Sequence, residues 1–359
     1  MSNSRQEKFS GTKQVEPHLQ LDAVSLEAYL KTVIPDYVGP LELRRFKGGQ
    51  SNPTYQLVTG NRNYVLRRKP PGPLLPSAHA VDREYRVIKA LSGVGFPVPR
   101  PYALCTDESV IGTMFYVMEM IEGRVLWEMS LPGMTPAERA KIYDAKVTTL
   151  AQLQKIDYKA VGLEDFGKPT DYFARQISRW TKNYVASETV KIELMDRLND
   201  WLPKNIPHDD AVSIVHGDYR MDNMIFHPTE PRVVAVLDWE LSTIGHPLGD
   251  FTYHLLPWLL PQMGERVSTL GGLDLKALGI PTEEEYIARY CELVGRKNIP
   301  GIDYYRAYTL WRVGAIYQGI IKRVQEGTAA NEHAETSPEL VKRIAEIAWH
   351  YARRHGAPA

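Results

Sequence analysis

The sequence predicts an α+β fold built from two lobes, a small β-rich N-terminal lobe and a larger, mainly helical C-terminal lobe. Three observations support this prediction. A chain of 359 residues is longer than one ordinary hydrophobic core requires, so two lobes are expected. Short strand-like segments dominate residues 41–120, with one helix among them. From residue 121 onward, apolar residues recur with the 3.6-residue period of amphipathic helices.

The predicted elements follow the chain in order. Residues 1–22 are polar and aperiodic, and we expect a loose tail there. A short amphipathic helix follows, in which Leu26, Tyr29, Leu30 and Val33 share one stripe. This pattern predicts an N-terminal lobe at residues 23–120 and a C-terminal lobe at residues 121–359. Strands are expected at 43–46, 55–58, 64–68 and 114–120, with a hairpin turn at Gly60 and Asn61, and helices at 136–156, 171–183, 188–201, 283–294, 303–326 and 337–354.

Composition excludes several classes of protein. The 43 Lys and Arg residues balance 43 Asp and Glu residues, whereas a dedicated nucleic-acid-binding protein normally carries a basic excess. Two cysteines cannot form a disulfide framework and indicate free thiols in a reducing compartment. The N-terminus has no apolar signal region, and the most apolar stretch, 251–263, is too short and proline-interrupted to span a membrane. We therefore expect a cytoplasmic protein with neither nucleic-acid nor membrane partners; the oligomeric state is not readable.

The most informative segment lies between residues 214 and 240. Two apolar runs, 224–226 and 233–237, flank a turn-forming segment and predict an antiparallel hairpin. Asn223 then stands at the entrance of the first strand and Asp238 at the exit of the second, so the two should meet at one edge. An amide oxygen beside a carboxylate suits Mg²⁺ that is held partly by phosphates. Asp218 lies in the loop just before, where its carboxylate could accept a proton from an attacking hydroxyl.

These residues carry a resemblance to a known family. The order Asp218-x-x-x-x-Asn223 followed by Asp238 resembles the catalytic loop and metal-binding segment of the protein-kinase-like fold. With His216 before it and Asp238-Trp239-Glu240 after it, the segment is similar to the aminoglycoside phosphotransferase and choline kinase family. It most closely resembles the kinase-like domain that some acyl-CoA dehydrogenases carry at their N-terminus. The resemblance covers residues 25–330, and 216–250 is its most specific part.

The resemblance implies roles for the residues of this segment. Asp218 matches the catalytic base that orients and deprotonates the acceptor hydroxyl, and Asn223 and Asp238 match the two Mg²⁺ ligands. His216 matches the residue that braces the catalytic loop, while Arg220 and Asp222 lie in the same motif with supporting roles. A further carboxylate, Asp250, resembles one that secures the loop, so a structural role is expected for it. The implied cofactors are ATP and Mg²⁺.

The smaller lobe must then supply the nucleotide clamp. Arg67 occupies the place where protein kinases usually carry a lysine, and Glu84 is its expected ion-pair partner. The sequence supports this pairing independently, because Glu84 falls within the apolar stripe of Val81, Tyr85 and Ile88 and unpaired burial of a carboxylate is costly. A position at the wet margin of that stripe remains the alternative. Arginine can pair with a carboxylate and a phosphate, but its presence leaves nucleotide affinity open.

Two backbone segments complete the expected ATP site. Gly48, Gly49, Ser51 and Asn52 belong to a turn that would fold over the phosphates, although a pair of glycines is also an ordinary turn. Glu119 and Met120, at the end of the smaller lobe, match the hinge segment whose backbone reads the adenine.

The sequence leaves two functions open. The first is an ATP- and Mg²⁺-dependent phosphotransferase that acts on a hydroxyl of a small molecule. The second is a nucleotide-binding pseudokinase that works as a binding or regulatory module, for which only Arg67 and the glycine segment argue. Protein kinase activity fits less well, because little chain separates Asp238 from Asp250 and no Ala-Pro-Glu follows. The dehydrogenase-linked relatives suggest a hydroxyacyl-CoA acceptor, and the neutral net charge argues modestly against polycationic aminoglycosides.

Two weaker patterns in the sequence each allow two interpretations. The stripe of Tyr304, Tyr308 and Trp311, with Arg312 beside it, reads as core packing or as a wall of the acceptor pocket. The run of His208, Asp209 and Asp210 reads as a solvated loop rather than a metal cluster.

Overall fold

A computed structural model describes residues 10–47, 52–70, 80–262, 268–327 and 337–358. The chain forms two compact units, each discontinuous in sequence. Unit 1 comprises Met1–Glu128, Lys159–Leu163 and Met221–Ser242, and unit 2 comprises Met129–Tyr158, Glu164–Arg220 and Thr243–Ala359. Unit 1 is β-rich and unit 2 is mainly helical, so the predicted α+β class is confirmed.

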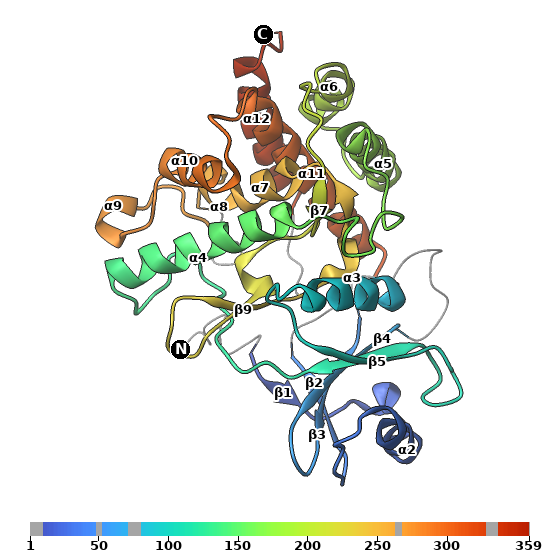
Figure 1. The fold of residues 1–359 in the computed structure, drawn as a ribbon. Helices are drawn as coiled ribbons and strands as arrows, with labels where there is room; N and C mark the ends of the chain where they lie inside the picture. The colour runs from blue at the N-terminus through green and yellow to red at the C-terminus, as the bar shows by residue number, and fades with distance from the viewer. Residues whose placement is uncertain (1–9, 48–51, 71–79, 263–267, 328–336, 359) are drawn as a thin grey trace. The chain divides into compact units, whose positions relative to one another are not determined.

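Unit 1 contains a six-stranded antiparallel sheet (Figure 1). Its strands are β1 (Thr12–Lys13), β2 (Glu42–Phe46), β3 (Thr54–Val58), β4 (Tyr64–Arg68), β5 (Pro101–Cys105) and β6 (Phe115–Glu119). They lie in the order β1-β2-β3-β4-β6-β5, and each neighbouring pair is antiparallel. Short connections suffice for such pairing, which is why β2, β3 and β4 follow one another directly in space and in sequence.

Two helices, α2 (Ala23–Val33) and α3 (Val81–Gly93), lie against the sheet on opposite faces (Figure 1). Side chains alternate between the two faces along each strand. In β4, Tyr64 and Leu66 join the core packed against α2, whereas Arg67 reaches a side chain of α3. This alternation brings a cation to the α3 face of the sheet.

The hairpin predicted around residue 230 is present in unit 1. It consists of β8 (Met224–Phe226) and β9 (Val233–Val236), which pair antiparallel with Met224 opposite Val236. A backbone bridge between Arg124 and Phe226 ties the hairpin to the segment that follows β6. This hairpin positions the residues expected to bind metal.

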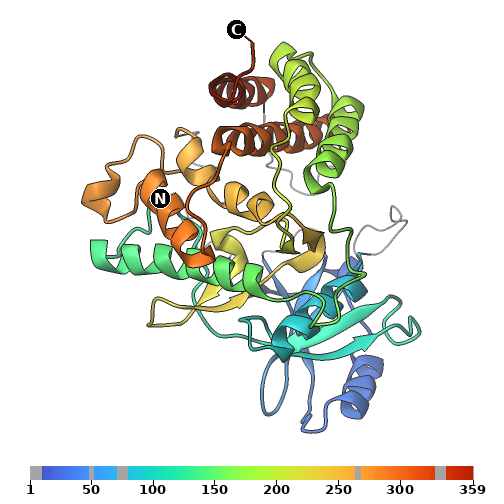
Figure 2. The ribbon, with the colours of Figure 1, turned by 45° about the horizontal axis from the view of Figure 1, so that its top comes forward.

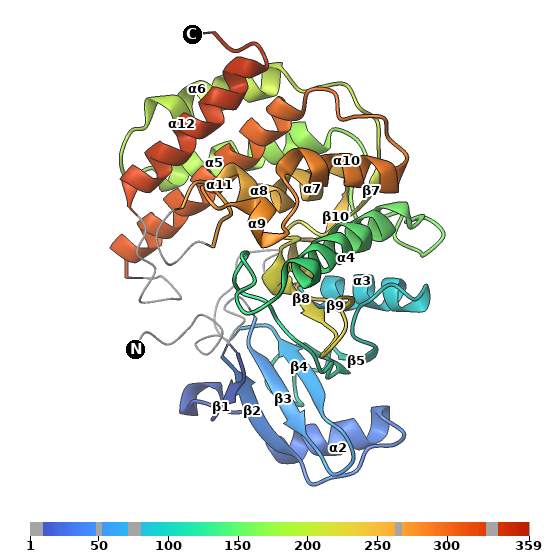
Figure 3. The same cartoon turned by 90° about the vertical axis from the view of Figure 1, so that its left-hand side faces the viewer.

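Unit 2 is a group of helices with one short two-stranded sheet, in which β7 (Ser213–Val215) pairs with β10 (Thr243–Gly245). Figure 2 shows α11 beside α12 and α5, and Figure 3 shows α4 alongside α10. Tyr304 and Trp311 of α11 are buried, and their polar atoms donate to Leu202 and Asn199, which fits core packing. Tyr308 is also buried, but its hydroxyl has no hydrogen-bond partner among the described residues. The helices are α4 (Pro136–Lys155), α5 (Tyr172–Ser187), α6 (Glu193–Trp201), α7 (Leu248–His254), α8 (Leu256–Leu259), α9 (Leu275–Leu278), α10 (Glu283–Val294), α11 (Ile302–Gln325) and α12 (Pro338–Arg354).

Most predicted elements are found with shifted ends. The six helices predicted after residue 121 correspond to α4, α5, α6, α10, α11 and α12. Strand β5 was not predicted, because the prolines around it resemble a loop. Part of the expected loose tail is ordered instead, since β1 pairs with β2. In the described part of the chain, no helix combines the length and the apolar character that crossing a membrane requires.

Candidate functional site

The β8–β9 hairpin brings Asn223 and Asp238 to the same end, as the sequence predicts. The Leu237 N–H donates to the Asn223 carbonyl oxygen at 2.8 Å, which fixes the two strand ends against each other. Asp238 adopts a left-handed backbone conformation with a φ of 65° between β9 and the short helical turn η4 (Trp239–Leu241). A non-glycine residue in this conformation is uncommon and occurs often at functional sites.

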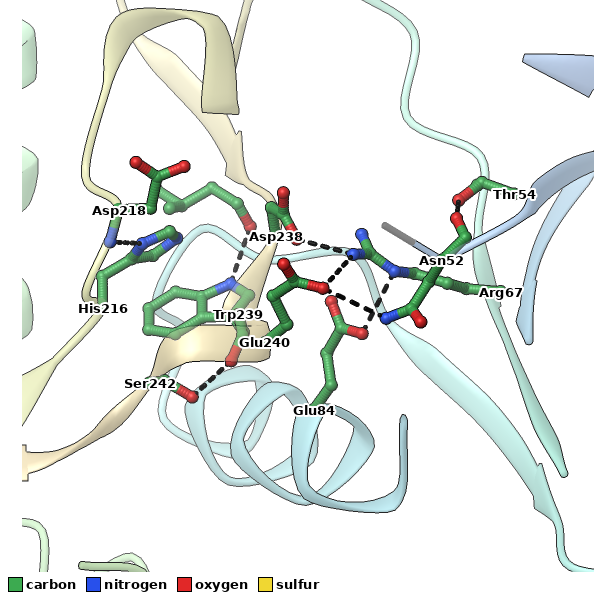
Figure 4. Close-up of polar contacts among 11 residues, drawn as sticks. Asn52, Thr54, Arg67, Glu84, His216, Asp218, Asp238, Trp239, Glu240 and Ser242 are labelled. Carbon is green, nitrogen blue, oxygen red and sulfur yellow. Dashed lines mark hydrogen bonds and ion pairs between the residues drawn. The ribbon is translucent and has the colours of Figure 1, made fainter. Parts of the chain in front are cut away.

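Arg67 lies at the centre of a cluster of carboxylates in unit 1 (Figure 4). Its Nε lies 3.2 Å from Glu84 Oε2, and its Nη2 lies 2.6 Å from Asp238 Oδ1 and 3.4 Å from Glu240 Oε2. Glu84 comes from the inward face of α3 and is 1% exposed. The predicted ion pair of Arg67 and Glu84 is therefore present, and Glu84 does not lie at a wet margin of its helix.

Three carboxylates share the one guanidinium of Arg67 in this cluster. Burial alone would lower the pKa of Arg67, but the carboxylates of Glu84 and Asp238 raise it above its ordinary value. Burial raises the pKa of Glu84 by removing its carboxylate from water; Arg67 opposes this rise, and the charges of Asp238 and Glu240 add to it.

The donor set at this end of the hairpin fits magnesium. Asn223 and Asp238 offer an amide oxygen and a carboxylate, the hard ligands that Mg²⁺ prefers. Within the described ranges there is no group of three or more His, Cys, Asp or Glu side chains that could hold a metal ion. The metal-binding role of both residues stays a prediction.

The other predicted nucleotide-binding residues of unit 1 are placed as follows. Asn52 is 1% exposed, and its Nδ2 donates to Glu240 Oε2 at 3.2 Å (Figure 4). Glu119 is the last residue of β6 and Met120 follows it. The Glu119 N–H donates to the Arg100 carbonyl oxygen at 2.8 Å. Gly48, Gly49 and Ser51 lie outside the described residues.

The loop that carries Asp218 belongs to unit 2 and is fixed through its backbone. Asp250, at 1% exposure, accepts the His216 N–H at 2.6 Å and the Gly217 N–H at 2.8 Å. Gly217 has a φ of 87°, which glycine adopts without strain, and its carbonyl oxygen accepts from Arg312 Nη2 at 2.7 Å. The buried His216 ring accepts the Asp218 N–H at 3.2 Å (Figure 4). The bracing contacts expected of His216 and Asp250 are therefore present.

Asp218 itself is kept in its ionised form. Burial alone would raise the pKa of this carboxyl, but Arg220, His216, Tyr253 and Arg312 outweigh it, so the pKa lies below its ordinary value. The closest of these charges is Arg220, whose Nε lies 3.0 Å from Asp218 Oδ1. A carboxylate that is ionised at neutral pH can accept a proton.

Replacing Asp250 with alanine should destabilise unit 2. Two buried N–H groups would lose their acceptor, and each such loss costs about 1–3 kcal/mol. We expect the free energy of unfolding in urea to fall by about 2–3 kcal/mol. Asp210→Ala is the matched control, because the Asp210 side chain is 91% exposed. Equal stability of the two variants would show that Asp250 does not hold the loop.

Several contacts at these residues were not predicted. The sequence assigns no role to Glu240, yet its carboxylate contacts both Arg67 and Asn52. Tyr253 interacts with Asp218, although the sequence shows only an aromatic residue three positions after Asp250. The sequence signal that could have found them is proximity in the chain, because Glu240 lies two positions after Asp238 and Tyr253 lies three positions after Asp250.

Comparisons with known proteins show the family to which the chain belongs. The family model described as "Phosphotransferase enzyme family" matches residues 42–278. A crystal structure from Ralstonia eutropha JMP134, of a protein whose name assigns it to the aminoglycoside phosphotransferases, is 50% identical with a TM-score of 0.84 and covers 93% of this chain and 99% of its own. A choline kinase structure from Cryptosporidium parvum shares the fold, with a TM-score of 0.62 at 13% identity over 93% of this chain and 95% of its own.

A curated relative is a longer protein with a different name. Acyl-CoA dehydrogenase family member 10 of Mus musculus is 44% identical over 346 residues, which is 96% of this chain and 32% of the relative. The chain thus spans about a third of the length of that relative. Both the match to the family model and the 50% identical structure cover most of this chain. The chain therefore belongs to the phosphotransferase enzyme family.

Proposed function

We propose that this protein is an ATP- and Mg²⁺-dependent phosphotransferase that phosphorylates a hydroxyl group of a small-molecule metabolite. The observation that carries the proposal is the set of contacts around Arg67, which joins Glu84 of α3 to Asp238 at the end of the hairpin. In the kinase-like resemblance, these are the residues for phosphate and metal binding. The arginine forms the expected pair with Glu84, which supports a working clamp despite the missing lysine.

The residues of the chain divide the work of the reaction. The acceptor oxygen attacks the γ-phosphorus, the bond from that phosphorus to the β–γ bridging oxygen breaks, and the acceptor proton passes to the carboxylate of Asp218. Arg67 offsets negative charge on the phosphates. Asn223 and Asp238 would hold Mg²⁺, which when bound supplies a positive charge that favours transfer.

The fold does not determine the acceptor. Two similar proteins carry names that point to different substrates, aminoglycosides for the bacterial structure and acyl-CoA thioesters for the mouse relative. The neutral net charge of the chain argues against a polycationic antibiotic. We therefore place a hydroxyacyl-CoA, or a similar hydroxylated metabolite, first among the candidates.

A Mg²⁺-dependent ATP consumption assay against pooled acceptors tests the proposal. The pools are hydroxyacyl-CoAs, amino alcohols, sugars and aminoglycosides. We expect turnover in one pool, and we expect Asp238→Asn to raise the half-saturating Mg²⁺ concentration at least about tenfold, because the variant loses an anionic ligand. Asp210→Asn, at an exposed position of unit 2, is the control and should leave it unchanged. ATP binding without transfer to any pool would instead favour the pseudokinase.

A further inference from the structure

We propose that the acceptor carries an anionic group, a carboxylate or a phosphate, that binds to donors of α5 and α11 next to the Asp218 loop. The donors are Arg179 and Trp180 of α5 and Tyr308 and Arg312 of α11. This inference rests on the proposed function and narrows its acceptor from any hydroxylated metabolite to one whose carboxylate or phosphate lies near the reacting hydroxyl. All the residues that carry it belong to unit 2.

Arg312 connects this group of donors to the catalytic loop. Its Nη2 donates to the carbonyl oxygen of Gly217, the residue before Asp218. Its guanidinium lies 4.8 Å from the ring centroid of Tyr253 and 5.6 Å from that of Trp180. Two aromatic rings and one hydrogen bond thus fix the orientation of Arg312, and an anion held there would lie close to the residue that accepts the proton.

Three hydrogen-bond donors at this place lack acceptors among the described residues. They are Arg312 Nε, Trp180 Nε1 and the Tyr308 hydroxyl, and each of these atoms is buried. Tyr308 is 1% exposed and Arg312 is 4% exposed, and the two lie one helical turn apart on the same face of α11. Buried donors are nearly always paired, so donors left over together indicate a missing acceptor with several lone pairs.

The charge of the region favours an anion over water as that acceptor. Arg179 and Arg312 are close enough to repel: burial first, and then the charge of Arg312, lower the pKa of Arg179. Burial raises the pKa of the Tyr308 hydroxyl, and the charges of Arg312 and Arg179 both oppose that rise. Of the carboxylates near Arg312, Asp218 already pairs with Arg220, and Asp250 is occupied by two backbone N–H groups. Two neighbouring arginines beside buried donors that lack acceptors in the described chain form an environment that binds a carboxylate or a phosphate.

The anion is assigned to the acceptor rather than to ATP. Arg67, with the predicted magnesium ligands of unit 1, accounts for the nucleotide phosphates. The donors of α5 and α11 stand outside that set and are linked to Asp218, which acts on the acceptor. An acceptor anchored here by its acidic group would present its hydroxyl to Asp218 in a fixed orientation.

Binding can be tested without turnover by NMR of the tryptophan indole N–H groups in the full-length protein. Trp180→Phe identifies the Trp180 signal, and the probes are acetate and inorganic phosphate, with chloride at equal ionic strength as the blank. We expect a saturable shift of the Trp180 signal with one of the two probes. Acetate alone would indicate a carboxylate, and phosphate would indicate a phosphomonoester. No shift with either probe would overturn the proposal and leave buried water as the partner of these donors.

Tyr308→Phe removes one donor and keeps the ring. We expect it to weaken probe binding about five- to tenfold, as for loss of a hydrogen bond to a charged group. Tyr184→Phe is the matched control: the Tyr184 hydroxyl of α5 is also buried without an acceptor in the described chain, but its charged neighbours are Glu188 and Asp196 rather than arginines. Equal weakening in both variants would overturn the assignment.

Kinetics then separate this proposal from the proposed function. Hydroxy acids and hydroxyalkyl phosphates should be used with higher kcat/KM than hydroxy amides of the same length, and Tyr308→Phe should raise KM for the acceptor but not for ATP. Equal use of acids and amides, or an effect on the KM for ATP alone, would overturn the anionic acceptor. If probes bind at Trp180 and no acceptor is phosphorylated, the proposed function fails while the anion site stands.

Discussion

Replacing Asp218 with alanine is expected to lower kcat about 10²–10⁴-fold, the range found when a general base is removed. The carboxylate is the proposed proton acceptor, and the contacts of its loop hold it in place from the backbone side. KM for ATP should change little, because the predicted nucleotide ligands lie elsewhere in the sequence. Steady-state ATP consumption with a productive acceptor measures both constants.

The pH profile gives a second measure of the same residue. The lowered pKa of Asp218 means that its carboxylate stays ionised until the pH falls below the ordinary Asp value of about 3.9. Catalysis by this group is therefore fully present at neutral pH and is lost only in acid. We expect no decline of kcat from Asp218 between about pH 8 and pH 6. Wild-type turnover in Asp218→Ala, with Asp210→Ala as the control, would refute the assignment.

The second large effect is expected from Arg67→Met. This change leaves Glu84 buried without its cation, and breaking one side of a buried ion pair costs about 3–5 kcal/mol. The free energy of unfolding should fall by about that amount, and KM for ATP should rise at least about tenfold because a phosphate-binding cation is lost. Urea denaturation measures the first quantity, and initial rates measure the second.

A double variant separates stability from function. Arg67→Met combined with Glu84→Leu replaces the pair by apolar groups, so most of the lost stability should return while activity does not. Arg45→Met is the matched control, because Arg45 lies on strand β2 of the same sheet and pairs with Glu16, both of them partly exposed. An exposed pair contributes up to about 1 kcal/mol. If Arg67→Met were no more destabilising than Arg45→Met, the cluster would not need its central cation.

The local sequence around residues 214–240 was sufficient to predict part of the candidate site. Two apolar runs around a turn can form little other than a hairpin, and antiparallel pairing then places Asn223 and Asp238 at the same end. The ion pairing of Glu84 could be predicted because this residue falls within an apolar stripe, and a buried carboxylate requires a cationic partner. These predictions succeeded because each depends on periodicity and on the cost of burying charge.

The contacts that depend on distant segments could not be predicted in the same way. Glu240 contacts Asn52 across 188 positions of sequence, and Arg312 donates to Gly217 across 95. Strand β5 forms because β6 offers it a partner, although its own proline-flanked sequence resembles a loop. Neither the local propensity nor the motif contains this information.

The sequence by itself determined the fold class, the hairpin and the position of Glu84 on the inward face of its helix, and its resemblance to a known family named Arg67 as the partner of Glu84. The first three follow from repeating patterns or from the energy of a single buried group. Only the tertiary structure decided that one guanidinium faces three carboxylates. It also decided that Asp250 accepts the backbone N–H groups of His216 and Gly217, and that α5 and α11 bring donors without acceptors in the described chain beside Arg312. These arrangements depend on how helices and strands far apart in the chain pack, and packing is a property of the whole fold.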